Sequence, residues 1–292
     1  MTAYDYVVPT TVEGAVAALA EHGEDAHVIA GGASMVLMLR QQLLVPSILV
    51  GLRGIPDLRG ITPASNGSLW IGATTTHRQI ERSPHVAAYA EALADAFSLV
   101  ATVRVRNQGT IGGNLAHADP AQDPPPILLA LDAMVHATGP TGARVIPIQD
   151  LFVDIFETSL APDEVITGVE LPVRPADAAA VYLKFLPASR DDYATLSVAV
   201  SARIGPDGWR DVRVALGAAA PVPLRVPAAE ARLDGVVPDG IAIAEAAAAV
   251  ADAVDPLTDS RGSAEYKRDM AVVWTRRALE RLAGRRPDEA AA

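Results

Sequence analysis

The chain has 292 residues, enough for about two or three compact units, and half of them are hydrophobic although aromatic residues make up only 4%. The formal net charge of −11 argues against a nucleic-acid partner, since affinity for nucleic acid comes mainly from Lys and Arg side chains that neutralise phosphates. The absence of cysteine excludes disulfides, thiolate catalysis and iron–sulfur ligation by this polypeptide.

The N-terminus, MTAYDYVVPTTVEG, has neither the basic segment nor the apolar run of a secretory signal. The longest apolar runs are interrupted by carboxylates and are too short to cross a bilayer. We therefore expect a cytoplasmic protein without a transmembrane segment.

The first 52 residues predict a small β-α-β-α-β unit. Apolar residues at helical spacing over 11–22 predict a helix with Thr10 or Thr11 as its N-cap. Short apolar runs at 26–30 and 47–52 predict buried strands. Between them, GGASMVLMLRQQLLVP predicts a glycine turn and a helix that ends near Pro46.

The middle of the chain mixes strands and helices. Residues 69–81 predict a strand, a turn and the start of a helix, and 85–101 predict a continuous helix that ends at about Ala101. Residues 139–152 predict a hairpin, and 162–172 predict a strand. The small and proline residues around 172–180 mark the best domain boundary.

The last third predicts an antiparallel sheet followed by two helices. Residues 180–186, 194–204 and 209–219 alternate like strands, with a turn at 205–208. Helices are predicted at about 240–254 and 263–283, the second capped by Ser263. We expect an N-terminal domain over 1–174, with subdomains of about 1–55 and 56–174, a second domain over 175–286, and a tail over 287–292.

Two glycine pairs are the strongest candidates for ligand binding. Gly31 and Gly32 separate a strand from a helix, where free backbone amides can receive a phosphate, and Ser34 adds a hydroxyl. Gly112 and Gly113 lie between the uncharged donors Thr110 and Asn114 in TIGGN. Neither pair fits the Rossmann or P-loop pattern. Together they predict one elongated ligand held at its diphosphate from two sides; the alternative is two unrelated turns.

The segment after TIGGN contains His117, Asp119 and Asp123, which invites a metal hypothesis. No second histidine lies near, so we expect no metal and interpret His117 as a turn or interface residue. Asp119, before a proline, is typical of a turn. Asp123 is the better candidate for ligand binding, because a carboxylate there could accept hydrogen bonds from ribose hydroxyls.

Five stretches resemble the flavoprotein (medium) subunits of the xanthine dehydrogenase and carbon monoxide dehydrogenase family of molybdenum hydroxylases. They are AGGASM (30–35), VRNQGTIGGNLAHADPAQD (105–123), SLAPDEVI (159–166), KFLPASRDDYA (184–194) and DSRGSAEYKRDM (259–270). They span nearly the whole chain in order, and the second is highly specific.

The resemblance implies an α+β fold: an FAD-binding domain of the vanillyl-alcohol-oxidase (PCMH) type with two α/β subdomains, and a C-terminal α+β domain with a three-stranded antiparallel sheet and helices. It implies that both glycine segments hold the FAD diphosphate, that Asp123 contacts the adenosine half, and that Tyr193 packs on the flavin ring. The implied FAD-binding residues are Ala30, Gly31, Gly32, Ala33, Ser34, Met35, Thr110, Gly112, Gly113, Asn114, Asp123, Leu160, Lys184 and Tyr193. The family often has Gln or His where this chain has Ala33. Because covalent attachment of a flavin uses His or Cys, Ala33 and the lack of cysteine favour non-covalent FAD.

The implied function is electron exit from a multi-subunit oxidoreductase, with no catalytic side chain and no metal on this chain. A large partner carries molybdopterin, a small partner carries [2Fe-2S] clusters, and FAD passes electrons to an external acceptor; the family points to a dimer of heterotrimers. Two alternatives stay open: a stand-alone flavin-dependent oxidase or reductase, and a non-redox nucleotide-binding assembly module.

Overall fold

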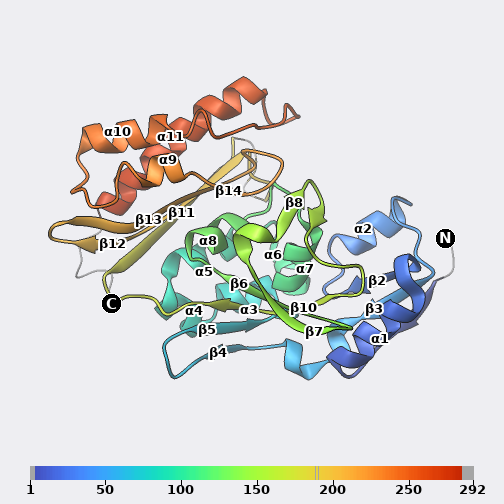
Figure 1. Ribbon diagram of the computed structural model, residues 1–292. Coiled ribbons are helices and arrows are strands. Elements are labelled where there is room, and N and C mark those ends of the chain that lie inside the picture. Colours follow the sequence, from blue (N-terminus) through green and yellow to red (C-terminus); the bar gives the residue numbers. More distant parts are fainter. Residues whose placement is uncertain (1–3, 188, 190, 285–292) are drawn as a thin grey trace.

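The computed structural model describes residues 4–187, 189 and 191–284. Its N-terminal unit, blue in Figure 1, is a three-stranded parallel sheet between two helices. Its strands run in the order β1-β3-β2. The elements are β1 (Asp5–Val7), α1 (Val12–His22), β2 (Ala26–Ile29), α2 (Met35–Arg40) and β3 (Ile48–Gly51). Thr11 caps α1 by accepting from the Gly14 amide. The predicted β-α-β-α-β unit is confirmed.

Helix α2 ends at Arg40, not near Pro46 as its apolar pattern predicts. Gln42 adopts a left-handed φ of 57°, and the Leu43 amide donates to the Met38 carbonyl. This is the Schellman arrangement that ends many helices, with Gln42 where glycine is usual. The position carries no glycine, so the sequence pattern did not reveal the stop.

A five-stranded antiparallel sheet forms the middle of the molecule, in the order β4-β5-β10-β6-β7. Its strands are β4 (Ile61–Pro63), β5 (Leu69–Gly72), β6 (Met134–Gly139), β7 (Gly142–Pro147) and β10 (Val165–Leu171). The hairpin between β6 and β7 turns at Gly139–Gly142, and a small hairpin of β8 (Phe152–Asp154) and β9 (Glu157–Thr158) lies beside it in sequence.

Short helices gather on this middle sheet (Figure 1). They are α3 (His77–Glu81), α4 (Pro84–Tyr89), α5 (Glu91–Ser98), α6 (Val103–Gln108), α7 (Ile111–His117) and α8 (Pro124–Ala130). The single helix predicted over 85–101 is wrong, because Ala90 is extended (φ −160°) and separates α4 from α5. The Tyr89 carbonyl accepts from the Arg174 guanidinium, a long-range bond that no local pattern reveals.

The C-terminal domain is an antiparallel sheet covered by helices on one face. The sheet contains the three predicted strands, β11 (Ala178–Phe185), β12 (Leu196–Gly205) and β13 (Gly208–Gly217), and at its edge a two-residue strand that was not predicted, β14 (Leu224–Arg225). The helices are α9 (Pro227–Glu230), α10 (Gly240–Ala248) and α11 (Ala264–Ala283). Ser263 caps α11 as predicted, α10 is shorter than predicted, and the tail over 287–292 lies outside the described residues.

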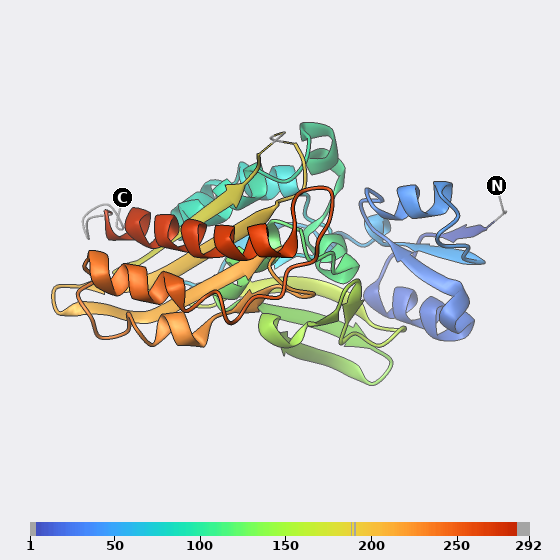
Figure 2. The ribbon, with the colours of Figure 1, turned by 90° about the horizontal axis from the view of Figure 1, so that it is seen from above.

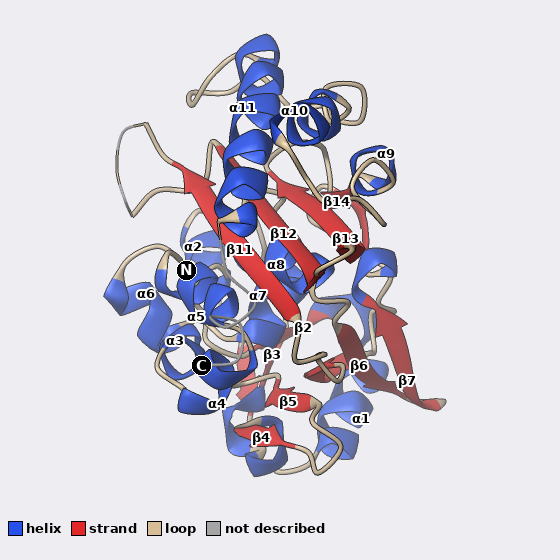
Figure 3. Cartoon of the chain, turned by 90° about the vertical axis from the view of Figure 1, so that its left-hand side faces the viewer, coloured by secondary structure: helices blue, strands red, loops and turns tan. Residues whose placement is uncertain are grey.

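The two faces of this sheet pack against different parts of the chain. Figures 2 and 3 show α10 and α11 over one face, and Figure 3 shows α8 behind the other. Alternation along β11 divides its side chains: Val181 joins the core under the C-terminal helices, whereas Ala180 and Tyr182 join the core of the middle sheet. The C-terminal domain is therefore docked through a shared core. No helix in the described part of the chain could span a membrane, and the cytoplasmic location stays a prediction.

Candidate functional site

The first glycine segment packs tightly against the turn before α7. A Cβ added to Gly31 would collide with the Gln108 carbonyl oxygen, and Gly32 has a φ of 78°, which favours glycine. Arg53 donates to the carbonyls of Ala30 (3.2 Å) and Gly31 (3.3 Å). In trans peptides the amide opposes the carbonyl, so the amides of Gly31 and Gly32 point away from Arg53.

The second glycine pair lies in the first turn of α7. Thr110 is the N-cap, and its hydroxyl accepts from the Gly113 amide at 3.2 Å. Two glycines disfavour a helix, but Ile111 and Leu115 are completely buried, and this burial stabilises the turn.

The two glycines of this pair have different roles. Gly112 is buried, its amide donates to the Ala73 carbonyl at 2.9 Å, and an added Cβ would lie 2.7 Å from the Ala73 Cβ. Gly113 is exposed, and its Cβ would contact only the Thr110 hydroxyl at 2.9 Å and the Ala30 Cβ at 3.9 Å. Gly112 therefore serves packing, while Gly113 keeps open a space that faces the first glycine segment.

Two buried polar atoms of residues next to predicted site residues have no hydrogen-bond partner among the described residues. They are Oδ1 of Asn114, which follows Gly113, and Oγ of Ser159, which precedes Leu160. Native proteins usually pair their buried polar atoms, so the Asn114 oxygen next to Gly113 is a candidate contact for a bound group. The residues present thus fit a ligand with hydroxyl and phosphate groups, as FAD has.

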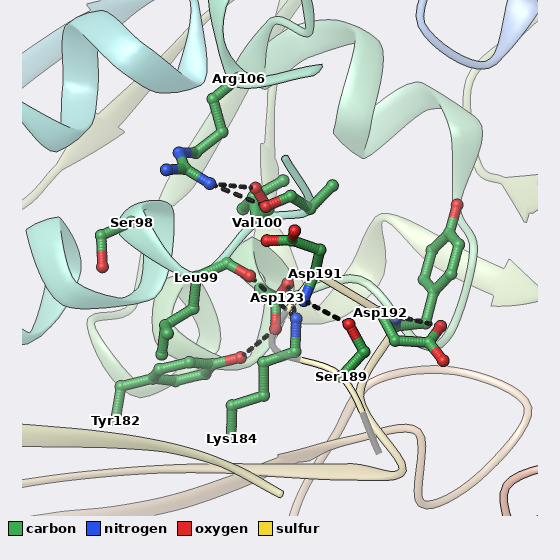
Figure 4. A network of polar contacts seen from close by, with 12 residues as sticks. Ser98, Leu99, Val100, Arg106, Asp123, Tyr182, Lys184, Ser189, Asp191 and Asp192 are labelled. Atoms are coloured by element: carbon green, nitrogen blue, oxygen red, sulfur yellow. Dashed lines mark hydrogen bonds and ion pairs between the residues drawn. The ribbon is translucent and has the colours of Figure 1, made fainter. Parts of the chain in front are cut away.

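Asp123 and Lys184 lie far apart in sequence but form a buried ion pair (Figure 4). Lys184 Nζ lies 2.9 Å from Asp123 Oδ2 and also donates to the Leu99 carbonyl at 2.9 Å, while the Tyr182 hydroxyl donates to Asp123 Oδ1 at 2.7 Å. The lysine side chain is 0% exposed. Burial raises the pKa of Asp123 to about 6, against the lowering influence of Lys184 and Tyr182. The structure thus brings these two predicted flavin contacts to each other.

Leu160 and Tyr193, the other two residues expected near the flavin ring, are both partly exposed. Leu160 is partly buried against the middle core, and Tyr193 is 44% exposed. The Arg261 guanidinium lies 5.4 Å from the Tyr193 ring centroid and donates to Asp192 at 3.0 Å. One face of the ring therefore has a cation–π partner. Partial burial raises the pKa of the Tyr193 hydroxyl.

Sequence reasoning missed Arg106, a buried residue of α6 (Figure 4). Its guanidinium donates to the carbonyls of Val100 (2.9 Å) and Ala101 (2.8 Å) and to Glu81 Oε2 (3.0 Å). The segment after α5 is thereby fixed directly before α6, which leads to the second glycine segment. The sequence VRVRNQ is typical of an exposed helix, so the composition of this segment gave no sign that Arg106 is buried.

His77 is a second missed residue, buried beneath the turn that precedes α7. Its amide donates to the Gly109 carbonyl at 2.9 Å, and a Cβ on Gly109 would meet the His77 ring at 2.9 Å. The ring packs on Phe97, with centroids 5.4 Å apart. Burial, with a smaller contribution from Arg106, lowers the pKa of His77 to about 4.

We expect His77 to make folding acid-sensitive. Its pKa is about 4 in the folded chain and 6.5 for a free histidine side chain, so the unfolded chain binds the proton first and stability falls as pH drops through this window. The shift corresponds to about 3 kcal/mol lost between the two values. Urea unfolding of wild type and His77→Phe at several pH values tests this: the difference in unfolding free energy should fall on acidification, and a pH-independent difference would contradict it.

The metal hypothesis for His117 finds no support in the described residues, which contain no group of three or more potential metal-ligating side chains. The His117 ring instead packs on Phe156, with centroids 5.2 Å apart, and burial lowers its pKa. Asp119 accepts from the Ala121 amide at 2.9 Å, which confirms it as a turn former.

Known families match both parts of the chain. Residues 2–174 match the family described as the FAD binding domain in molybdopterin dehydrogenase, and residues 181–282 match the CO dehydrogenase flavoprotein C-terminal domain. The chain therefore belongs to the FAD-binding subunits of molybdopterin-dependent dehydrogenases. This confirms the predicted family, the α+β fold with a PCMH-type FAD-binding domain, and the oxidoreductase class.

Within that class the chain is similar to carbon monoxide dehydrogenase flavoproteins. It is 36% identical to the carbon monoxide dehydrogenase medium chain of Afipia carboxidovorans over 97% of each chain. It is also 36% identical to the nicotine 6-hydroxylase medium subunit of Paenarthrobacter nicotinovorans, over 96% of this chain and 97% of that one. Its structure matches a chain of carbon monoxide dehydrogenase from Hydrogenophaga pseudoflava with a TM-score of 0.93, 36% identity and 96% coverage of both.

Proposed function

We propose that this chain binds FAD non-covalently between its two glycine segments and serves as the electron exit of a three-subunit enzyme. Electrons arrive from [2Fe-2S] clusters on a small partner, after a large molybdopterin partner has oxidised the substrate. They leave to an external acceptor. The assembly we propose is a dimer of heterotrimers in the cytoplasm.

The observation that carries the proposal is the cradle built by the two glycine segments. Gly31 and Gly112 allow close packing, while Gly113 leaves space beside Ala30 and the Asn114 oxygen has no partner among the described residues. The amides at the start of α7 are already bonded within the chain. The amides of Gly31 and Gly32 have no acceptor among the described residues, and such free backbone donors suit a phosphate. Such a cradle grips a diphosphate without a charged side chain, which agrees with the uncharged sequence TIGGN.

FAD supplies the redox chemistry, because it can exchange electrons with both one-electron and two-electron partners. The chain's own residues bind and orient the cofactor. Thr110 holds the Gly113 amide in the first turn of α7, and Arg53 fixes the peptides of the first segment. Ala33 supplies no histidine or cysteine side chain to which a flavin could be attached, which supports non-covalent binding.

Two features support the partner subunits. The relatives are described as a medium chain or medium subunit, which indicates further chains in those enzymes. The absence of cysteine means that iron–sulfur clusters must lie on another polypeptide if electrons pass through them.

The experiment compares the isolated chain with the chain co-expressed with its large and small partners. Carbon monoxide, nicotine and xanthine serve as test substrates, and an artificial dye and oxygen serve as acceptors. We expect no substrate oxidation by the isolated flavoprotein and oxidation by the complex. Turnover by the isolated chain would favour a stand-alone flavin oxidase, and adenine nucleotide binding without a flavin would favour a non-redox assembly module.

A further inference from the structure

The buried cluster of Asp123, Lys184, Tyr182 and Leu99 lies where the two family domains meet (Figure 4). Asp123 and Leu99 belong to the region matched by the FAD-binding family, 2–174, and the other two residues belong to β11 in the region matched by the C-terminal family, 181–282. The side chains of Lys184 and Asp123 are 0% and 5% exposed. A ligand in solution therefore has almost no access to either charge.

One ammonium group holds both ends of the segment that carries the second glycine pair. Lys184 Nζ contacts the Leu99 carbonyl before that segment and the Asp123 carboxylate after it, each at 2.9 Å. Arg106 binds the next two carbonyls, those of Val100 and Ala101. The stretch 99–123 is thus closed at its ends by a side chain of the other domain.

The electrostatics of the Asp123–Lys184 pair indicate that it fixes the position of these segments more than it adds to the free energy of folding. Burial raises the pKa of Asp123 even with an ammonium 2.9 Å away, so desolvation of the carboxylate outweighs the attraction. Buried ion pairs often stabilise a fold no better than apolar residues would, yet breaking one partner is costly. Tyr182 keeps its proton, because burial and Asp123 raise its pKa well above the usual value, and so remains a donor.

We propose that Lys184 and Asp123 are positioning residues: their interdomain ion pair fixes the second glycine segment against the first and sets flavin affinity, although neither charged group touches the flavin. The flavin part of this inference rests on the proposed function. The interdomain part concerns the chain without any cofactor and can be tested separately.

The test is a double-mutant cycle on the full chain, alone or co-expressed with its partners, with Lys184→Met, Asp123→Asn and both together. If the residues act through one link, each single variant raises the Kd for FAD by on the order of 30-fold, and the double variant is no worse than the weaker-binding single. If each contacts FAD independently, the double variant shows the product of the two single effects, and the proposal is wrong.

A second readout uses hydrogen exchange of the flavin-free chain. We expect each single variant to speed exchange in β11 and in the segment 99–101, because the interdomain link is broken before any flavin binds. Unchanged exchange in both segments would overturn the proposal, whatever the effect on FAD. If wild type binds no FAD at all, the proposed function fails and this readout alone decides the interdomain link.

Two further variants guard against loss of folding. Tyr182→Phe removes one donor to Asp123 while keeping the ring, and we expect only about a threefold weaker FAD affinity, because the ion pair with Lys184 stays intact. Arg203→Met is the matched control, since Arg203 pairs with Asp177 at the opposite, exposed end of β11. An equal loss of affinity in Arg203→Met and Lys184→Met would show that any change in the sheet matters and would overturn the specific role.

Discussion

Gly113→Leu should remove bound FAD from a chain that remains folded. Gly113 is exposed in the first turn of α7, and its Cβ would point into the space between Thr110 and Ala30. A leucine there fills the space beside Ala30 and keeps a phosphate away from the free backbone amides of Gly31 and Gly32. Loss of two such hydrogen bonds costs about 3 kcal/mol, which raises the Kd for FAD on the order of 100-fold.

The fold should tolerate this change better than the same change at Gly112. The Gly112 Cβ would press on the Ala73 backbone, whereas the Gly113 Cβ meets only the Thr110 hydroxyl closely. Leucine is a good helix former, so we expect the melting temperature to shift by a few degrees at most. Fluorescence titration with FAD and thermal unfolding measure the two effects.

Gly240→Leu is the control for Gly113→Leu. Gly240 is the first residue of α10, and a Cβ there meets nothing within 4 Å. We expect wild-type FAD affinity in this variant. Undiminished FAD binding by Gly113→Leu would show that the glycine cradle is not the flavin site. In the complex, Gly113→Leu should still allow substrate oxidation with a dye that takes electrons from the partners.

Arg106→Leu should produce the largest loss of stability. The change removes the donor to the Val100 and Ala101 carbonyls and one partner of the largely buried Glu81. Unpaired buried acceptors and a broken buried ion pair together cost about 3–5 kcal/mol. Urea unfolding at neutral pH measures this loss.

Arg276→Leu is the matched control for Arg106→Leu. Arg276 pairs with Glu280 on the exposed face of α11, with both side chains about half exposed. An exposed pair of this kind contributes less than about 1 kcal/mol. Equal stability losses in the two variants would contradict the role given to Arg106. We expect Arg106→Lys to recover part of the loss, since an ammonium can serve some of the same acceptors.

Local chemistry made much of the fold and the glycine site predictable. Thr11 and Ser263 are cap residues placed by simple side-chain bonds. The strands of the C-terminal sheet were recognised from their apolar pattern, although β12 is buried on both faces over most of its length. The glycine pairs stood out because so bare a backbone is rare beside uncharged donors. The structure places both segments in contact, although the second pair begins a helix.

The remaining features depend on partners distant in sequence. Ala90 breaks a helix where Arg174 takes the Tyr89 carbonyl, and Gln42 ends another without a glycine. The pairing of Lys184 with Asp123 requires the C-terminal sheet to dock on α8, which periodicity does not reveal. Side chains such as His77 and Arg106 acquire their roles from burial and from tertiary contacts that periodicity does not reveal.

The visible absorption spectrum of the purified chain, followed by chromatography of what heat releases, tests the central claim most directly. We predict the two absorption bands of an oxidised flavin and free FAD in the supernatant after heating, since no covalent attachment is expected. The same measurement on the co-expressed complex tests whether the flavin site forms only when the partner subunits are present. A colourless chain and a complex that contains no FAD would contradict the assignment of the glycine segments as the flavin site.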